Sequence, residues 1–238
     1  MVASATAQRA LDAYGGVDRW RSAEAVEAVV SAWGWAFRLK WCRRFTEVKV
    51  HANVWAPRVR ITPYGRPYGT PGGSGVLDGP DVRIEDASGV VIAERKRARD
   101  AFAHFRRGLW WDRLDQMYFA GYALWNYFAL PAMLLRTDIV WAEVADGVLQ
   151  GRFPPTLPTH CTEQTFHFDR ATGLLMRHDY TADVIGAGAH AAHLVTEHGE
   201  RDGVPFPSRR RVVPRRSDGG ARSRPLLIGL DVHEWRLI

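Results

Sequence analysis

The sequence predicts a mainly β (α+β) fold, in which a long antiparallel sheet curls and a central helix fills its concave face. Three observations lead to this prediction. Short segments rich in β-branched and aromatic residues follow one another, with turn signals between them. One stretch, residues 118–135, has no charged side chain. At 238 residues the chain fits one domain, residues 1–238, with residues 112–135 as an inserted helical plug.

The N-terminal part predicts a short helix followed by strands. Residues 6–14 place apolar side chains at helical spacing, and two glycines end the pattern. Residues 25–41 are rich in β-branched and aromatic residues, which favours a strand. Residues 46–55 give the clearest strand, because Val, Val, Ala and Val alternate with Glu, Lys, His and Asn. Such alternation is typical of a strand that is packed on one face and solvated on the other.

The charge-free stretch predicts a helix over residues 112–130 that is buried between protein surfaces. Asn126 near the centre, Pro131 and Gly121 argue against a membrane span, for which about 20 predominantly apolar residues are needed. Tyr118, Tyr122, Trp125 and Asn126 fall at helical spacing and share one face. Pro131 should end or kink the helix.

The other elements follow from period-two patterns and turn residues. A hairpin signal at residues 87–89 separates strands at 82–86 and 90–94, and a helix start at 100–107 leads into the central helix. After the central helix the strands return, at residues 140–152 with a turn at Asp146 and Gly147, and then at 159–169, 174–183, 190–198, 206–213 and 226–237.

Composition limits the classes of partner. The net charge is +6, but Arg209–Arg211 lie in a predicted strand, where side chains point to alternating faces, so we expect no nucleic-acid partner. Two cysteines cannot form a disulfide scaffold. The first residues lack a basic segment followed by an apolar one, so a cytoplasmic location is expected, with no membrane insertion. The oligomeric state stays open.

Several segments together resemble the LolA/LolB lipoprotein-carrier superfamily. They are Ala-Tyr-Gly-Gly at residues 13–16, His-Phe-Asp-Arg-Ala-Thr-Gly-Leu-Leu-Met-Arg-His-Asp-Tyr at 167–180 and Asp-Gly-Val-Pro-Phe-Pro at 202–207. Residues 118–125, together with His160 and Gln164, are similar to uncharacterised soluble bacterial proteins of this type. The resemblance implies an incomplete β-barrel closed by helices around an apolar cavity. It supplies no catalytic residues.

Histidines on the later strands are the candidate reactive groups. Alternation places His160 and Gln164 on the concave face of one strand, and His178 and Tyr180 on that of the next, whereas it does not decide for His193. If the three histidines converge, they could move protons near neutral pH. A metal held by His160, His178 and His193 is a minority alternative, because no metal-ligand motif supports it. The histidines could equally be ordinary hydrogen-bonded strand residues.

These observations predict a protein that binds a small hydrophobic or aromatic molecule in a cavity. Cofactor-free acid–base chemistry (cyclisation, isomerisation or elimination) is the first expectation, and a carrier of a lipid or hydrophobic metabolite is the alternative. The residues leave enzyme and carrier both open. The candidate catalytic residues are His160, His178, His193 and Tyr180. The candidate ligand-binding residues are Tyr118, Tyr122, Trp125, Asn126, Gln164 and, on a glycine- and proline-rich loop, Arg66 and Tyr68.

Overall fold

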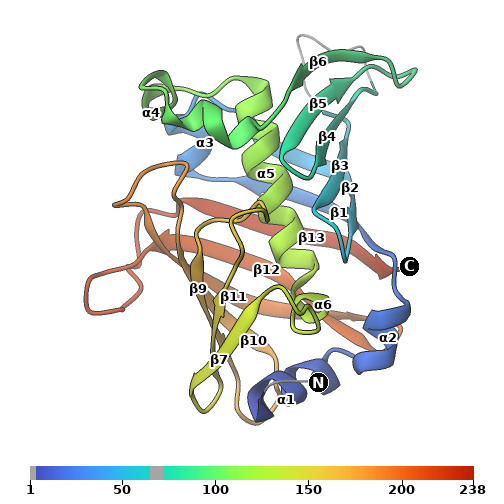
Figure 1. The fold of residues 1–238 in the computed structure, drawn as a ribbon, viewed down its shortest axis with the longest axis vertical. Coiled ribbons are helices and arrows are strands. Elements are labelled where there is room, and N and C mark those ends of the chain that lie inside the picture. The colour runs from blue at the N-terminus through green and yellow to red at the C-terminus, as the bar shows by residue number, and fades with distance from the viewer. Residues whose placement is uncertain (1–3, 65–71) are drawn as a thin grey trace.

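Thirteen antiparallel strands form one curled sheet in the computed structural model, which describes residues 4–64 and 72–238 (Figure 1). Their order is β6-β5-β4-β3-β2-β1-β13-β12-β11-β10-β9-β8-β7. In the described chain β6 and β7 end the sheet, which is therefore an incomplete barrel, as predicted. The strands are β1 (Ala25–Trp33), β2 (Phe45–Asn53), β3 (Arg58–Thr62), β4 (Ser74–Asp78), β5 (Asp81–Glu85), β6 (Val91–Arg95), β7 (Val140–Ala145), β8 (Val148–Arg152), β9 (Glu163–Phe168), β10 (Leu175–Thr181), β11 (His190–Arg201), β12 (Val204–Pro214) and β13 (Ile228–Leu237).

The sheet consists of two meanders that meet at its centre. Strands β1 to β6 form one meander, β7 to β13 form the other, and β1 pairs with β13. The chain therefore leaves the sheet at one edge, β6, and returns at the opposite edge, β7. The helical residues between these two strands cross the concave face, which explains why the central helix is inserted at this point (Figure 1).

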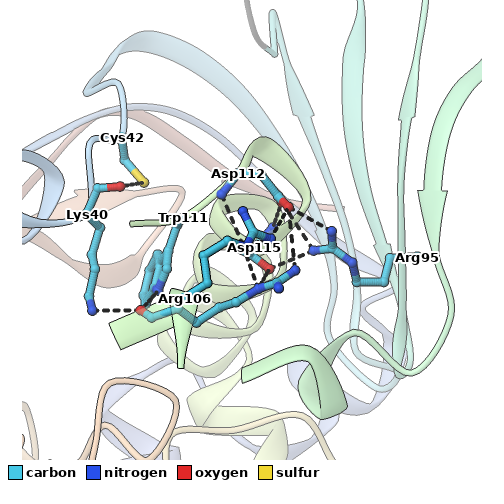
Figure 2. A network of polar contacts seen from close by, with 8 residues as sticks. Lys40, Cys42, Arg95, Arg106, Trp111, Asp112 and Asp115 are labelled. Atoms are coloured by element: carbon cyan, nitrogen blue, oxygen red, sulfur yellow. Dashed lines mark hydrogen bonds and ion pairs between the residues drawn. The ribbon is translucent and has the colours of Figure 1, made fainter. Parts of the chain in front are cut away.

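The central helix, α5, fills the concave side of the sheet. Asp112 caps it, because the Asp112 side chain accepts a hydrogen bond from Asp115 N and the Asp115 side chain accepts one from Asp112 N (Figure 2). All but three of the α5 side chains are buried, so the helix packs between protein surfaces, as predicted. The helices are α1 (Ala5–Ala13), α2 (Val17–Ser22), α3 (Trp35–Leu39), the 3-10 helix η1 (Ala98–Ala103), α4 (Arg106–Leu109), α5 (Arg113–Phe128) and α6 (Leu130–Met133).

None of the helices within residues 4–64 and 72–238 is long and apolar enough to cross a bilayer. The charge-free stretch instead breaks into α5 and α6 around Ala129, with Pro131 in the first turn of α6, where its missing N–H costs no hydrogen bond.

Two sequence predictions about strands are wrong. The strand predicted over residues 25–41 ends at Trp33, because Gly34 adopts a φ of 131° and α3 follows. The strand predicted from residue 159 begins only at Glu163. His160 therefore lies in the segment before β9 and not on the strand itself.

Candidate functional site

A group of polar and aromatic side chains lies on the concave face of the sheet, beneath the C-terminal half of α5. The group consists of six side chains, and all of them are buried. His160, His193 and Arg210 are exposed by 1% or less. Three of them come from β10 and β11, one from β12, one from α5 and one from the segment before β9. We call this group the inner polar cluster; its members are Tyr127, His160, His178, Tyr180, His193 and Arg210.

Strand register brings the histidines together. His178 on β10 is the direct cross-strand partner of His193 on β11, and their ring centroids lie 6.1 Å apart. His160 reaches the same place from the preceding segment and stacks on Tyr180, with centroids 3.7 Å apart and ring planes inclined by 7°. The three histidines predicted from the sequence therefore converge, and His193 takes the inward position that alternation left undecided.

A directional chain of hydrogen bonds joins β10 to α5. The Gln164 amide nitrogen donates to Cys161 O and to Thr159 Oγ1, so its oxygen faces His178 Nε2 at 2.8 Å. Thr159 Oγ1 donates in turn to Asn126 Oδ1 at 2.8 Å, and Asn126 donates to Tyr122 O. Gln164 and Asn126 thus belong to the chain of hydrogen bonds that ends at His178, and their role in ligand binding stays a prediction.

Tyr127 links the members of the cluster, and sequence reasoning missed it. Its hydroxyl lies 3.3 Å from His160 Nε2 and 3.2 Å from the Tyr180 hydroxyl. The edge of its ring meets His193, with centroids 4.4 Å apart. Tyr127 follows Asn126 directly, about 100° further round the helix, and this proximity to the predicted face is the signal that could have identified it.

Arg210 is the second residue that the sequence reasoning missed. Arg209 and Arg211 point outward and form ion pairs with Asp231. Arg210 between them points inward, is 1% exposed, and donates from Nη2 to Tyr127 O at 3.1 Å. Alternation in a strand implies that one of three consecutive arginines faces the interior. Arg210 forms no ion pair with an Asp or Glu among the described residues, and the titratable groups that act on its pKa are the hydroxyls of Tyr14, Tyr127 and Tyr180, which are neutral at neutral pH.

Several polar atoms of this region lack hydrogen-bond partners within the described residues. They are His160 Nδ1, His193 Nδ1 and Nε2, Tyr122 Oη and Arg210 Nε. Buried polar atoms are rarely left without partners, because an unmade hydrogen bond costs free energy. These are the polar atoms of the region that remain available to a further hydrogen-bond partner.

Burial determines the charge of each group. It lowers the pKa of His160 to about 3, with a smaller contribution from Arg99, and lowers the pKa values of His178 and His193 well below their ordinary range. Burial raises the pKa of Tyr127 to about 12. It also lowers the pKa of Arg210 to about 10, so this guanidinium stays protonated at neutral pH. At neutral pH the cluster therefore consists of neutral rings and one cation.

The remaining predicted residues are not members of the inner polar cluster, although Tyr122 borders it. Tyr118 and Tyr122 are buried neighbours, with ring centroids 5.3 Å apart, and the Tyr122 ring also contacts His160 at 5.1 Å. Trp125 is fully buried, but its indole N–H donates to Asn53 O on β2, away from the histidines. Arg66 and Tyr68 fall outside the described residues.

A metal centre at the three histidines has no support in this arrangement. Within residues 4–64 and 72–238 no group of three His, Cys, Asp or Glu side chains is placed to hold a metal ion. The imidazoles stack on other rings instead, His160 on Tyr180 and His178 on Phe166 at 4.2 Å.

A groove and a small cavity lie against the described part of the sheet, and Trp125 lines neither of them. A groove of about 950 Å³ is lined by the exposed side chains of β1, β2 and β13, among them Glu27, Lys49 and His51, and so lies on the side opposite α5. A small cavity of about 30 Å³ lies between α3 and α5, beside Phe119. The apolar cavity expected beside Trp125 stays a prediction.

Three solved structures are similar in fold. A DUF1329 family protein from Desulfovibrio piger has a TM-score of 0.51 at 15% identity, covering 98% of this chain and 92% of its own. A LolA superfamily protein from Nitrosomonas europaea has a TM-score of 0.51 at 10% identity, covering 99% and 94%. A domain named for outer membrane lipoprotein sorting, from Vibrio parahaemolyticus, has a TM-score of 0.50 at 11% identity, covering 98% and 90%.

Sequence comparison adds nothing to this likeness. No protein-family model matches the chain, and no curated protein matches it. The open thirteen-stranded sheet with helices on its concave side agrees with the three structures over nearly their full lengths. The chain has a LolA-like fold.

Proposed function

We propose that the protein binds a small, substantially apolar molecule that carries an acidic group, with the acidic group beside Arg210 and the apolar part between α5 and the sheet. The observation that carries this proposal is the Arg210 guanidinium, buried without a carboxylate partner and with Nε unbonded among the described residues. A buried charge is costly unless it is paired. A carboxylate or phosphate of the ligand would supply the missing partner.

The surroundings of Arg210 suit the rest of such a ligand. The inner polar cluster is bordered by the aromatic rings of Tyr122, Phe119 and Phe166, which offer apolar contact area. Because the cluster is closed in this structure, binding requires α5 or the segment before β9 to move. The name of the Vibrio parahaemolyticus domain, which refers to lipoprotein sorting, is consistent with an apolar ligand in this fold.

The test uses saturated fatty acids and their methyl esters, which differ in charge but hardly in shape. The acid should bind the wild-type protein roughly tenfold to a hundredfold more tightly than the ester, since a hydrogen bond to a charged group contributes about 1.5–3 kcal/mol. In Arg210→Met this preference should vanish, and Arg210→Lys should keep part of it. Isothermal titration measures both affinities. If the acid and the ester bind equally well, the proposal that the ligand carries an acidic group is refuted. If neither of them binds, the proposal that the ligand is a small apolar molecule with an acidic group is refuted.

The second candidate function is catalysis by proton transfer at the inner polar cluster, in a cyclisation, an isomerisation or an elimination. The unbonded nitrogens of His160 and His193 favour it, because they are free to meet a substrate. Against it, an imidazole whose pKa is about 3 is a weak base at neutral pH. His160→Ala and His178→Ala separate the two functions: a carrier keeps its ligand affinity nearly unchanged, whereas an enzyme loses turnover. A carrier of a lipid or hydrophobic metabolite needs only the binding step.

A further inference from the structure

One end of the molecule exposes large apolar side chains. Trp41 and Phe105 are 84% and 85% exposed, and four others on the same two segments are between 43% and 58% exposed. With about 150–250 Å² for a whole aromatic side chain, the six together expose on the order of 700 Å², more than monomers usually leave uncovered. We call this set the α3–α4 patch; its members are Trp35, Leu39, Trp41, Phe105, Leu109 and Trp110.

The two segments that carry the patch, residues 35–44 and 101–111, are fixed to each other. Lys40 Nζ donates to Arg107 O at 2.9 Å and to Gly108 O at 2.7 Å, and Trp111 N donates to Lys40 O at 3.0 Å. Figure 2 shows Lys40 reaching across to the α4 segment, and Figure 1 places α3 and α4 side by side. The exposed side chains therefore lie on neighbouring, mutually anchored elements.

The charge of these segments has one sign. They contain Arg38, Lys40, Arg43, Arg44, Arg106 and Arg107, and no Asp or Glu. Asp112 and Asp115, just beyond the second segment, form ion pairs with Arg106 and Arg107. Arg38, Arg43 and Arg44 stay exposed around the patch, and Arg38 lies over the Trp35 ring at 5.3 Å.

We propose that the α3–α4 patch docks the protein on the surface of an anionic lipid bilayer. Tryptophan and other large apolar side chains enter the boundary between headgroups and acyl chains, while neighbouring arginines are attracted to anionic headgroups. The patch supplies both kinds of side chain and has no acidic residue to oppose them. Such docking is peripheral and involves no spanning segment.

The position of the patch relates docking to the interior of the half-barrel. The cavity of about 30 Å³ lies directly behind α3, bounded by Phe37, Trp111 and Phe119. The Phe119 ring is 6.1 Å from that of His160 in the inner polar cluster. A molecule leaving a bilayer at the patch would thus meet a line of aromatic rings that leads to the concave face.

The experiment measures co-sedimentation of the full chain with vesicles of pure phosphatidylcholine or of equal parts phosphatidylcholine and phosphatidylglycerol. The wild-type protein should bind the anionic vesicles. Trp41→Ser with Phe105→Ser should weaken this binding roughly tenfold or more, through lost apolar burial. Arg43→Gln with Arg44→Gln should weaken it roughly twentyfold at low salt, because each basic residue near such a surface contributes about fivefold.

The matched control is Val140→Ser with Val144→Ser on the edge strand β7, which removes two exposed apolar side chains that lie outside the α3–α4 patch. This variant should bind as the wild type does. Because all these side chains are exposed, unfolding curves should coincide. The proposal is overturned if the wild type binds neither vesicle, or if the Trp41/Phe105 variant binds as well as the control. It is also overturned if light scattering shows that the patch pairs two copies of the chain, or if nucleic acid competes the protein off the vesicles.

Discussion

Gln164 Oε1 lies 2.8 Å from His178 Nε2, and the other bonds of the glutamine determine which atom donates. The Gln164 nitrogen faces the Cys161 carbonyl, which can only accept, so the Gln164 oxygen is left as an acceptor for His178. His178 must therefore carry its hydrogen on Nε2, with a bare Nδ1. Histidine side-chain ¹⁵N shifts should show this tautomer, and the opposite tautomer would contradict the arrangement.

The same bond predicts a stability cost. Gln164→Leu leaves the buried His178 N–H without an acceptor and should lower the free energy of unfolding by about 1–3 kcal/mol. Gln8→Leu is the control, because the exposed Gln8 side chain donates to Asp12 in the same helix and supports no buried group among the described residues. Urea unfolding measures both. Equal stability of the two variants would show that His178 finds another partner.

The free energy of unfolding should fall as the pH is lowered from about 6.5, because of the three buried histidines. Their pKa values are depressed in the native state, chiefly by burial, whereas in the unfolded chain they lie near 6.5. Below that pH the unfolded chain binds protons that the native state does not, so the unfolded state gains stability. Each of the three contributes a slope of up to about 1.4 kcal/mol per pH unit, until the pH reaches its native pKa.

The variant His193→Leu measures how much one of the three histidines contributes to the dependence of the unfolding free energy on pH. Neither ring nitrogen of His193 has a hydrogen-bond partner among the described residues, so at neutral pH the variant should be as stable as the wild type or more so. Between pH 6 and 5 its slope should be smaller by about 1.4 kcal/mol per unit. His104→Asn, at an exposed position, is the control. A slope that His193→Leu does not reduce would mean that His193 is protonated in the native state.

Much of the fold follows from local sequence signals. Alternation over residues 46–55 predicts the observed burial of Val48, Val50 and Ala52, and the turn at Asp146 and Gly147 separates β7 from β8 as expected. The charge-free stretch predicts a buried helix because only a protein interior accepts such a surface at this length. Alternation fails for residues 35–39, where aromatic residues typical of strands form α3 after the glycine at position 34.

The candidate site is predictable only in part, because the pairing register of the strands determines which side chains meet there. Strand alternation places His178 and Tyr180 inward, but the approach of His193 depends on the pairing of β10 with β11. Arg210 escapes prediction since a run of arginines suggests a charged surface, and only the outward ion pairs of its neighbours reveal that it points the other way. Tyr127 reaches His160 and Tyr180 through the placement of α5, which no local pattern specifies.

The N-terminus of α5 should depend strongly on Asp115. This carboxylate is fully buried and lies 2.6 Å from Arg95 and 3.1 Å from Arg107, while it also completes the cap of the helix (Figure 2). Asp115→Asn leaves Arg107 buried beside a neutral group and should cost about 3–5 kcal/mol of unfolding free energy. Asp146→Asn, which removes an exposed ion pair with Arg9, should cost less than about 1 kcal/mol. Similar losses in the two variants would show that the Asp115 network is not structural.

Gly121 determines how closely α5 packs on the sheet. A Cβ added there would lie 2.8 Å from the Leu77 Cβ on β4, and neither atom can move by rotating a side chain. Gly121→Ala should therefore push α5 away from β4, at a cost of about 1–3 kcal/mol that exceeds the gain of about 1 kcal/mol in helix propensity. Gly108→Ala in α4 meets nothing within 4 Å and should be neutral or slightly stabilising.

The displacement of α5 has a second expected effect, on the inner polar cluster that this helix covers. Amide hydrogen exchange of residues 191–195 on β11 should accelerate in Gly121→Ala and stay unchanged in Gly108→Ala, since only the first variant loosens the cover over His193. If α5 must move for a ligand to enter, the association rate of a bound fatty acid should rise in Gly121→Ala as well. Faster exchange without faster association would place the entrance elsewhere, at the segment before β9 that carries His160.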